Sequence, residues 1–118
     1  MIDLTIPVYQ ALKDNAYIKA NVTGGVHQYT IASGKSPPYI RIAELNNYDS
    51  QFHDNSPYAS ALRFQIDIWT PYNPHPIAVE VDKTMKAMGF SRTSANPQWD
   101  DTLKGFRKIM RYQTVKTF

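Results

Sequence analysis

The chain contains no cysteine among its 118 residues. This absence excludes a disulfide framework, a thiolate zinc site and a cysteine nucleophile. No apolar run approaches the roughly 20 residues that span a bilayer, and the segment Met1–Leu4 lacks the basic and apolar stretches of a signal peptide. A chain of this length can bury a core of its own. We therefore expect one soluble, unexported domain over residues 1–118, with no membrane partner.

Charge and histidine are also sparse. The net charge of +3 indicates only a weak attraction to acidic partners. No two of the histidines stand three or four positions apart, and His53 with Asp54 and Asp49 is better interpreted as a polar loop than as a metal site. The three histidines are His27, His53 and His75.

A glycine-lysine-serine triplet at 34–36 is the one fragment that suggests phosphate chemistry. A phosphate-binding loop needs an earlier glycine, where this chain has Tyr29, and a following helix, which Pro37 and Pro38 forbid. We predict a solvated turn at 34–36. Over the whole sequence we expect no catalytic residue, no metal and no cofactor.

Aromatic residues and one strand pattern stand out among the features that are present. Aromatics make up 13% of the chain, with eight tyrosines, and tyrosine is enriched in strands and at protein interfaces. The run Ala61–Trp69 alternates apolar and polar side chains, so one face belongs to a core. A helical pattern follows over Pro76–Met88. The expected core residues are Leu62, Phe64, Ile66, Ile68, Ala78, Val81 and Met85.

The remaining patterns predict the other elements. Further strands are expected over 26–32, 39–45 and 106–115, and a helix over 3–20. The polar segments Asn46–Ser60 and Arg92–Asp101 are predicted to be loops, although the sequence leaves open an extra short strand after Gly89. The order α-β-β-β-α-β predicts an α+β, two-layer sandwich. Its mostly antiparallel four-stranded sheet carries two helices on one face.

Two features of the strands concern charge. Asp67 lies on the polar face of its strand, where a cross-strand ion pair with Arg41, Arg107 or Arg111 is expected. The terminal strand mixes basic and aromatic residues, which can serve single-stranded nucleic acid. It lacks the glycine-aromatic signature of sheet-type RNA binders. We expect no specific nucleic acid partner.

A family resemblance extends over most of the chain. It consists of an amino-terminal helix, the sequence SPPYIRI at 36–42 entering a strand, the strand ALRFQIDIW at 61–69, and a helix ending MKAMGF at 85–90. This succession resembles the tail-completion, or tail-terminator, proteins of long-tailed bacteriophages and prophages. The long polar segment Asn46–Ser60 and the segment 91–101 depart from the pattern.

The resemblance implies a non-enzymatic structural protein of the virion, assembled in the host cytoplasm. Its copies would form a ring, commonly a hexamer, that closes the head-proximal end of the tail tube and joins it to the head connector. Its partners would be itself, the tail tube protein and the connector. The residues expected at assembly interfaces are Tyr48, Phe52, Tyr58, Trp69, Arg107 and Arg111. Another head-tail connector or minor tail protein is the alternative, and a nucleic-acid-binding accessory domain is the alternative from another class.

Overall fold

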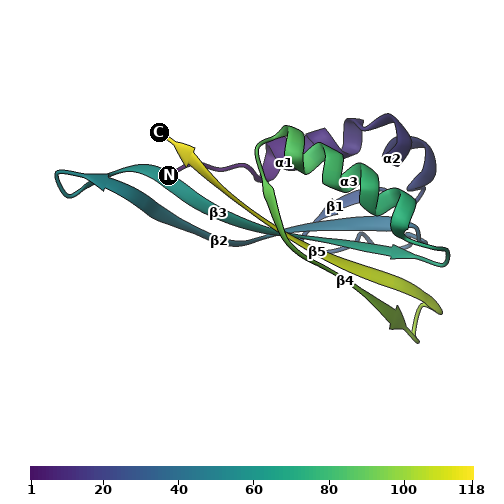
Figure 1. Ribbon diagram of the computed structural model, residues 1–118. Helices are drawn as coiled ribbons and strands as arrows, with labels where there is room; N and C mark the ends of the chain where they lie inside the picture. The colour runs from purple at the N-terminus through teal and green to yellow at the C-terminus, as the bar shows by residue number, and fades with distance from the viewer.

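A computed structural model of residues 1–118 contains three helices and five strands. The helices lie together on one face of a sheet with strand order β1-β2-β3-β5-β4 (Figure 1). β1 pairs with β2 in parallel, and every other pair is antiparallel. The bounds are α1 Thr5–Asp14, α2 Ala16–Asn21, β1 Val26–Gln28, β2 Tyr39–His53, β3 Ser56–Thr70, α3 His75–Ala87, β4 Ser91–Asp100 and β5 Gly105–Thr117. No helix has the length and apolarity to cross a membrane.

The α+β, two-layer architecture is confirmed, and three of its predicted details are wrong. The sheet has five strands instead of four, because the segment predicted as a loop after Gly89 forms β4. β1 is only three residues long and runs parallel to β2 instead of forming a hairpin with it. The single helix predicted over 3–20 is two helices.

The break between α1 and α2 has a clear cause in Asn15. Its backbone is extended (φ −62°, ψ 125°), and its side-chain oxygen accepts a hydrogen bond from the Ile18 amide at 3.0 Å. An asparagine that caps a helix in this way starts a new one. The same side chain donates to Glu80 at 3.3 Å and to Thr84 at 3.2 Å, so it also ties the helix pair to α3.

The core lies between the helices and the central strands, and all seven residues expected there are buried. Even-numbered residues of β3 point toward the helices, as the alternation predicts. Phe64 is fully buried and packs edge-on against Phe90, with ring centroids 5.5 Å apart. The cluster also takes in residues from the first helices and the neighbouring strands, among them Val8, Leu12, Ile18, Ile40, Ile42, Met110 and Tyr112.

α3 ends in a way that places the next strand. Gly89 has φ +88°, its amide donates to Lys86 O, and the Phe90 amide donates to Met85 O, both at 3.0 Å. This pair of hydrogen bonds around a glycine in the left-handed conformation ends a helix and turns the chain sharply. β4 therefore begins directly beside the end of α3.

A partly buried polar network joins α3 to the two last strands. The Tyr112 hydroxyl donates to Asp82 at 2.9 Å, and Lys86 and Arg92 pair with the same carboxylate at 2.9 and 3.2 Å. Burial, together with the neighbouring Asp82 charge, raises the pKa of the Tyr112 hydroxyl. Burial alone would raise the pKa of Asp82, but hydrogen bonds from Lys86 and Tyr112 and the charge of Arg92 lower it.

The segment Asn46–Ser60, predicted as a loop, instead continues β2 and β3 as a hairpin that we call the arm. Its turn is made by Asp54 and Asn55, both at positive φ (51° and 65°), between the paired residues His53 and Ser56. Asparagine and aspartate tolerate this conformation, which two-residue hairpin turns require. The arm projects beyond the helices (Figure 1), and the molecule measures 53 × 26 × 25 Å.

Candidate assembly surfaces

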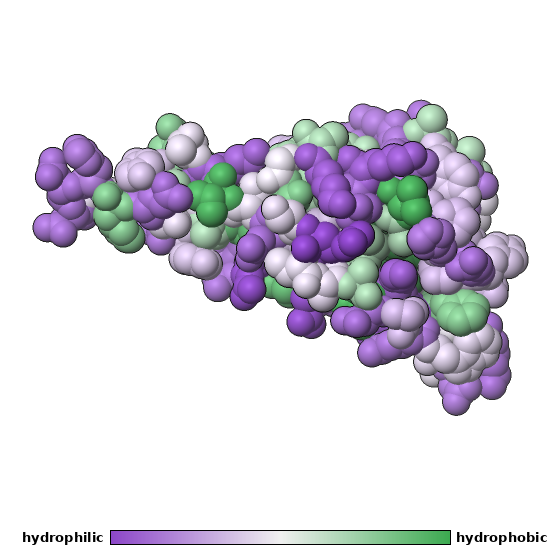
Figure 2. All heavy atoms as spheres, in the orientation of Figure 1, coloured by the Kyte–Doolittle hydropathy of each residue, from purple (hydrophilic) through white to green (hydrophobic).

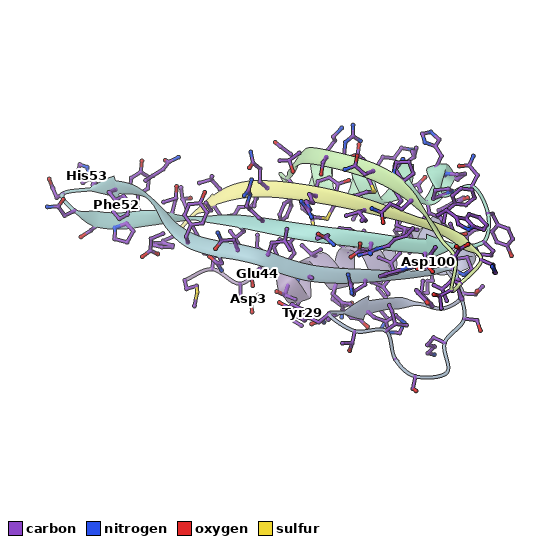
Figure 3. The ribbon with its side chains drawn as sticks, turned by 90° about the horizontal axis from the view of Figure 1, so that it is seen from below. Asp3, Tyr29, Glu44, Phe52, His53 and Asp100 are labelled. Carbon is purple, nitrogen blue, oxygen red and sulfur yellow. The ribbon has the colours of Figure 1, made fainter.

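The face of the sheet that the helices leave open, which we call the outer face, carries a row of charged and aromatic side chains. Figure 3 views the molecule from this side, with Phe52 and His53 at the arm tip and Asp100 at the opposite end. The odd-numbered residues of the central strands point outward here. From β2, β3 and β5 they include Tyr39, Arg41, Arg63, Gln65, Asp67, Trp69, Arg107, Arg111 and Gln113.

Asp67 lies at the centre of a cluster of side chains at the end of this face away from the arm. Its side chain is 0% exposed, and a guanidinium reaches each carboxylate oxygen, from Arg41 at 2.8 Å and from Arg107 at 3.0 Å. The two arginine side chains remain 28% and 29% exposed. Gln65 also donates to both oxygens, at 3.1 and 3.2 Å. The predicted ion pair is confirmed for Arg41 and Arg107, whereas Arg111 donates to Gln65 Oε1 at 3.1 Å.

Trp69 completes this cluster. The guanidinium carbons of Arg41 and Arg107 each lie 5.1 Å from the centroid of its ring, and Tyr39 packs against it edge-on at 5.6 Å. A cation over an indole face is attracted by the ring quadrupole. The arrangement presents one partly exposed aromatic ring between two guanidinium groups. Trp69 and Arg107 were expected at an interface from the sequence, but Tyr39, which is paired with Trp69 across the strands, was not.

The arm carries the second group of predicted interface residues. Tyr48, Phe52 and Tyr58 are 52%, 61% and 43% exposed. Hydrophobic residues are interspersed among hydrophilic ones along the projecting hairpin (Figure 2). The amide of Phe118 donates to Tyr58 O at 2.8 Å, so the exposed ring of Phe118 also belongs to the arm's base. Exposed aromatics at the end of a projection suit interface anchoring.

The sheet has two open edges. β5 lies between β3 and β4, so its basic residues lie within the sheet and not along an edge. Arg107 and Arg111 point to the outer face, whereas Lys116 donates to Met88 O at 2.9 Å on the helix side. The open edges are β4 and the part of β2 beyond Ile42, where β1 ends. Unpaired edges can accept a strand from another chain.

Sequence analysis also missed an aromatic pair at the β4–β5 turn. Trp99 is 56% exposed and packs edge-on against Phe106 with centroids 5.3 Å apart. Its indole donates to Asp101 at 2.9 Å. This pair lay outside the prediction because the segment was interpreted as a loop. No group of three or more histidine, aspartate or glutamate side chains converges as metal ligands would.

No protein-family model and no curated protein sequence matches the chain. Its fold is nevertheless similar to that of a solved chain from the virion of a native gene transfer agent particle. The TM-score is 0.64 at 14% sequence identity, and the match covers 94% of this chain and 92% of that one. At an identity this low, the structural match shows a common fold. The match includes almost the full length of both proteins.

Proposed function

We propose that the protein is a structural component of a phage virion. Its copies form a ring, a hexamer like that common in tail-terminator proteins, at the head-proximal end of the tail tube. The observation that carries this proposal is the fold shared, over nearly all of both chains, with a chain of a gene transfer agent virion. The resemblance of the segments 36–42, 61–69 and 85–90 to tail-terminator proteins supports the finer role.

The surfaces of the chain fit this role. A ring needs a heterologous contact, in which one patch of a subunit meets a different patch of its neighbour. The arm, with Tyr48, Phe52 and Tyr58, projects from one end of the molecule, whereas the Trp69 cluster and the Trp99 turn lie at the other. A head-to-tail contact can therefore pair unlike surfaces. The partners in this role are further copies of the chain, the tail tube protein and the head connector.

The nucleic-acid alternative receives less support from the placement of the charges. The basic residues of β5 divide between the two faces of the sheet, and Arg107 forms an ion pair with Asp67. A strand-binding groove instead requires basic groups that follow the phosphate backbone continuously. Another connector or minor tail protein remains the alternative within the virion.

Electron microscopy of purified tails tests the proposal. We expect density for this chain as a ring at the head-proximal end, and tails of abnormal length or without heads when the protein is absent. Tails of normal length that join heads without it would refute the role. In size-exclusion chromatography a ring should have an apparent mass several-fold above the 13.5 kDa of one chain. If the isolated protein is a monomer, microscopy of tails decides whether it assembles there.

The arm provides the variant experiment. Phe52→Ser with Tyr58→Ser should leave a folded monomer, because both side chains are exposed, and should abolish ring formation on tails. Tyr29→Ser is the matched control, since it removes a comparably exposed aromatic that belongs neither to the arm nor to the opposite end of the molecule. If the arm variant assembles as well as the control, the arm is not an interface.

A further inference from the structure

A second pair of arginines lies on the outer face, and this pair has no carboxylate. Arg63 is paired with Gln113 and Arg111 with Gln65, so the two arginines are diagonal neighbours on adjacent strands. Long side chains at such positions reach one another. None of the ion pairs within the chain includes either residue, and both are exposed.

A trough of about 170 Å³ lies between these arginines. It is lined by Leu45, Arg63, Thr93, Ser94, Arg111 and Tyr112. Ser94 is directly opposite Arg111 across the strands, and Thr93 donates to Arg111 O at 3.3 Å. Arg111 Nε donates a hydrogen bond to Gln65 Oε1 at 3.1 Å, which leaves the two terminal nitrogens of that guanidinium free.

The sheet's two irregularities occur at the walls of this same trough. The register shifts in β2 between Glu44 and Asn46, which makes Leu45 the extra residue, and in β4 between Arg92 and Ser94, which makes Thr93 the extra residue. A bulge redirects side chains and is common beside functional sites. Both bulges contribute a wall residue to one small cavity that also contains two like charges.

The neighbouring Asp67 cluster shows what such a pair of arginines binds. There, two guanidinium groups from adjacent strands hold one carboxylate between them. Arg63 and Arg111 repeat the arrangement nearer the arm, with glutamine and serine beside them but no acid. Like charges placed close together are unfavourable unless an anion compensates them.

We propose that the trough between Arg63 and Arg111 binds an aspartate or glutamate side chain presented by another protein chain. The trough's volume suits a single carboxylate, and Asp67 stands between the two adjacent arginines, so the positive groups of the outer face do not form an unbroken track for nucleic acid. A guanidinium binds a carboxylate through paired hydrogen bonds. This inference goes beyond the ring, and it does not depend on ring formation.

Titration of the ¹⁵N-labelled protein with a short glutamate homopeptide, followed through the arginine Nε–H signals, tests the site. We expect the signals of Arg63 and Arg111 to move along one saturable curve. Arg63→Gln with Arg111→Gln, followed through the backbone amide signals of β3 and β5, should weaken binding about tenfold or more for each arginine removed, because a hydrogen bond to a charged group is worth at least that factor. Arg111→Lys should give an intermediate affinity, since it keeps the charge but loses the paired geometry.

Lys35→Gln is the matched control, because it removes one positive charge from an exposed residue of a distant loop. Unchanged melting temperatures verify that the variants fold. Three results would overturn the proposal: no saturable binding, equal weakening by Lys35→Gln, or tighter binding of a single-stranded DNA oligonucleotide that displaces the peptide. If the unmodified protein binds the peptide but forms no ring on tails, that result would count against the proposed function and not against this site.

Discussion

Replacing Asp67 by asparagine removes the central charge of the outer face while keeping the side chain's size. In the native protein each oxygen of Asp67 accepts hydrogen bonds from a guanidinium, at 2.8–3.2 Å. Asparagine offers one oxygen, and its amide group would face a guanidinium donor with a donor of its own. At least one arginine, Arg41 or Arg107, therefore loses its partner.

The size of the effect can be bounded. Removing one member of a buried ion pair costs about 3–5 kcal/mol when the remaining charge stays buried. Here Arg41 and Arg107 keep more than a quarter of their side chains exposed, so water can replace part of what they lose. We expect Asp67→Asn to lower the free energy of unfolding by about 2–3 kcal/mol, equivalent to one or two hydrogen bonds to a charged group.

Urea unfolding measures this change as a lower midpoint at constant slope. Lys83→Gln is the matched control: its ammonium group is exposed and lies 3.6 Å from the Glu80 carboxylate, and such a pair is worth no more than about 1 kcal/mol. If Asp67→Asn destabilises the protein no more than Lys83→Gln does, the ion pairs of Asp67 do not stabilise the fold.

Three further predictions concern the helix side. Phe64→Ala should cost ~3–5 kcal/mol, because the side chain is fully buried against Phe90; an unchanged urea midpoint would contradict this. The lowered pKa of Asp82 means that its contribution to stability is complete above its ordinary pKa of about 3.8 and is lost as pH falls through the lower folded value. Asp82→Asn should therefore reduce the stability lost on acidification, as followed by circular dichroism. Gly89→Ala should cost about 1–2 kcal/mol, since residue 89 has φ +88°, and a neutral result in thermal melts would show that the helix end rearranges.

The central part of the fold was predictable because burial imposes a period on the sequence. β3 is covered by helices on one face and by neighbours on both edges, so its apolar residues alternate strictly from Leu62 to Ile68. α3 shows an apolar stripe for the same reason. Pairing of Asp67 with Arg41 and Arg107 was also predictable, because a carboxylate within a strand needs a cross-strand partner.

The arm and β4 were not predictable, because neither has a buried face over most of its length. Where both faces contact solvent, no alternation is required and a polar strand cannot be distinguished from a loop. Asp54 and Asn55 were the available signal for the arm, since a pair of such residues suits a two-residue hairpin turn. Pro97 argued against β4, yet an edge strand tolerates proline because one side of its backbone is unpaired.

The trough could not be inferred from sequence for a different reason. Arg63 and Gln113 are recognisable as outward residues of their strands, but their pairing depends on register. The extra residues Leu45 and Thr93 reset the register on the two flanking strands. A bulge has no reliable sequence signature, so the residues of the trough come together only in the folded chain.

The placement of the buried core bears on how such a chain can assemble without unfolding. The helices cover the part of the sheet that contains the core, whereas the arm extends beyond them with its aromatic side chains exposed. A two-stranded hairpin on its own is marginally stable in water. Contact with a neighbouring chain would bury the exposed rings of the arm and order it, at no cost to the core. We therefore expect separate substitutions to change assembly and monomer stability, with Phe52 in the proposed interface affecting the first and Phe64 the second.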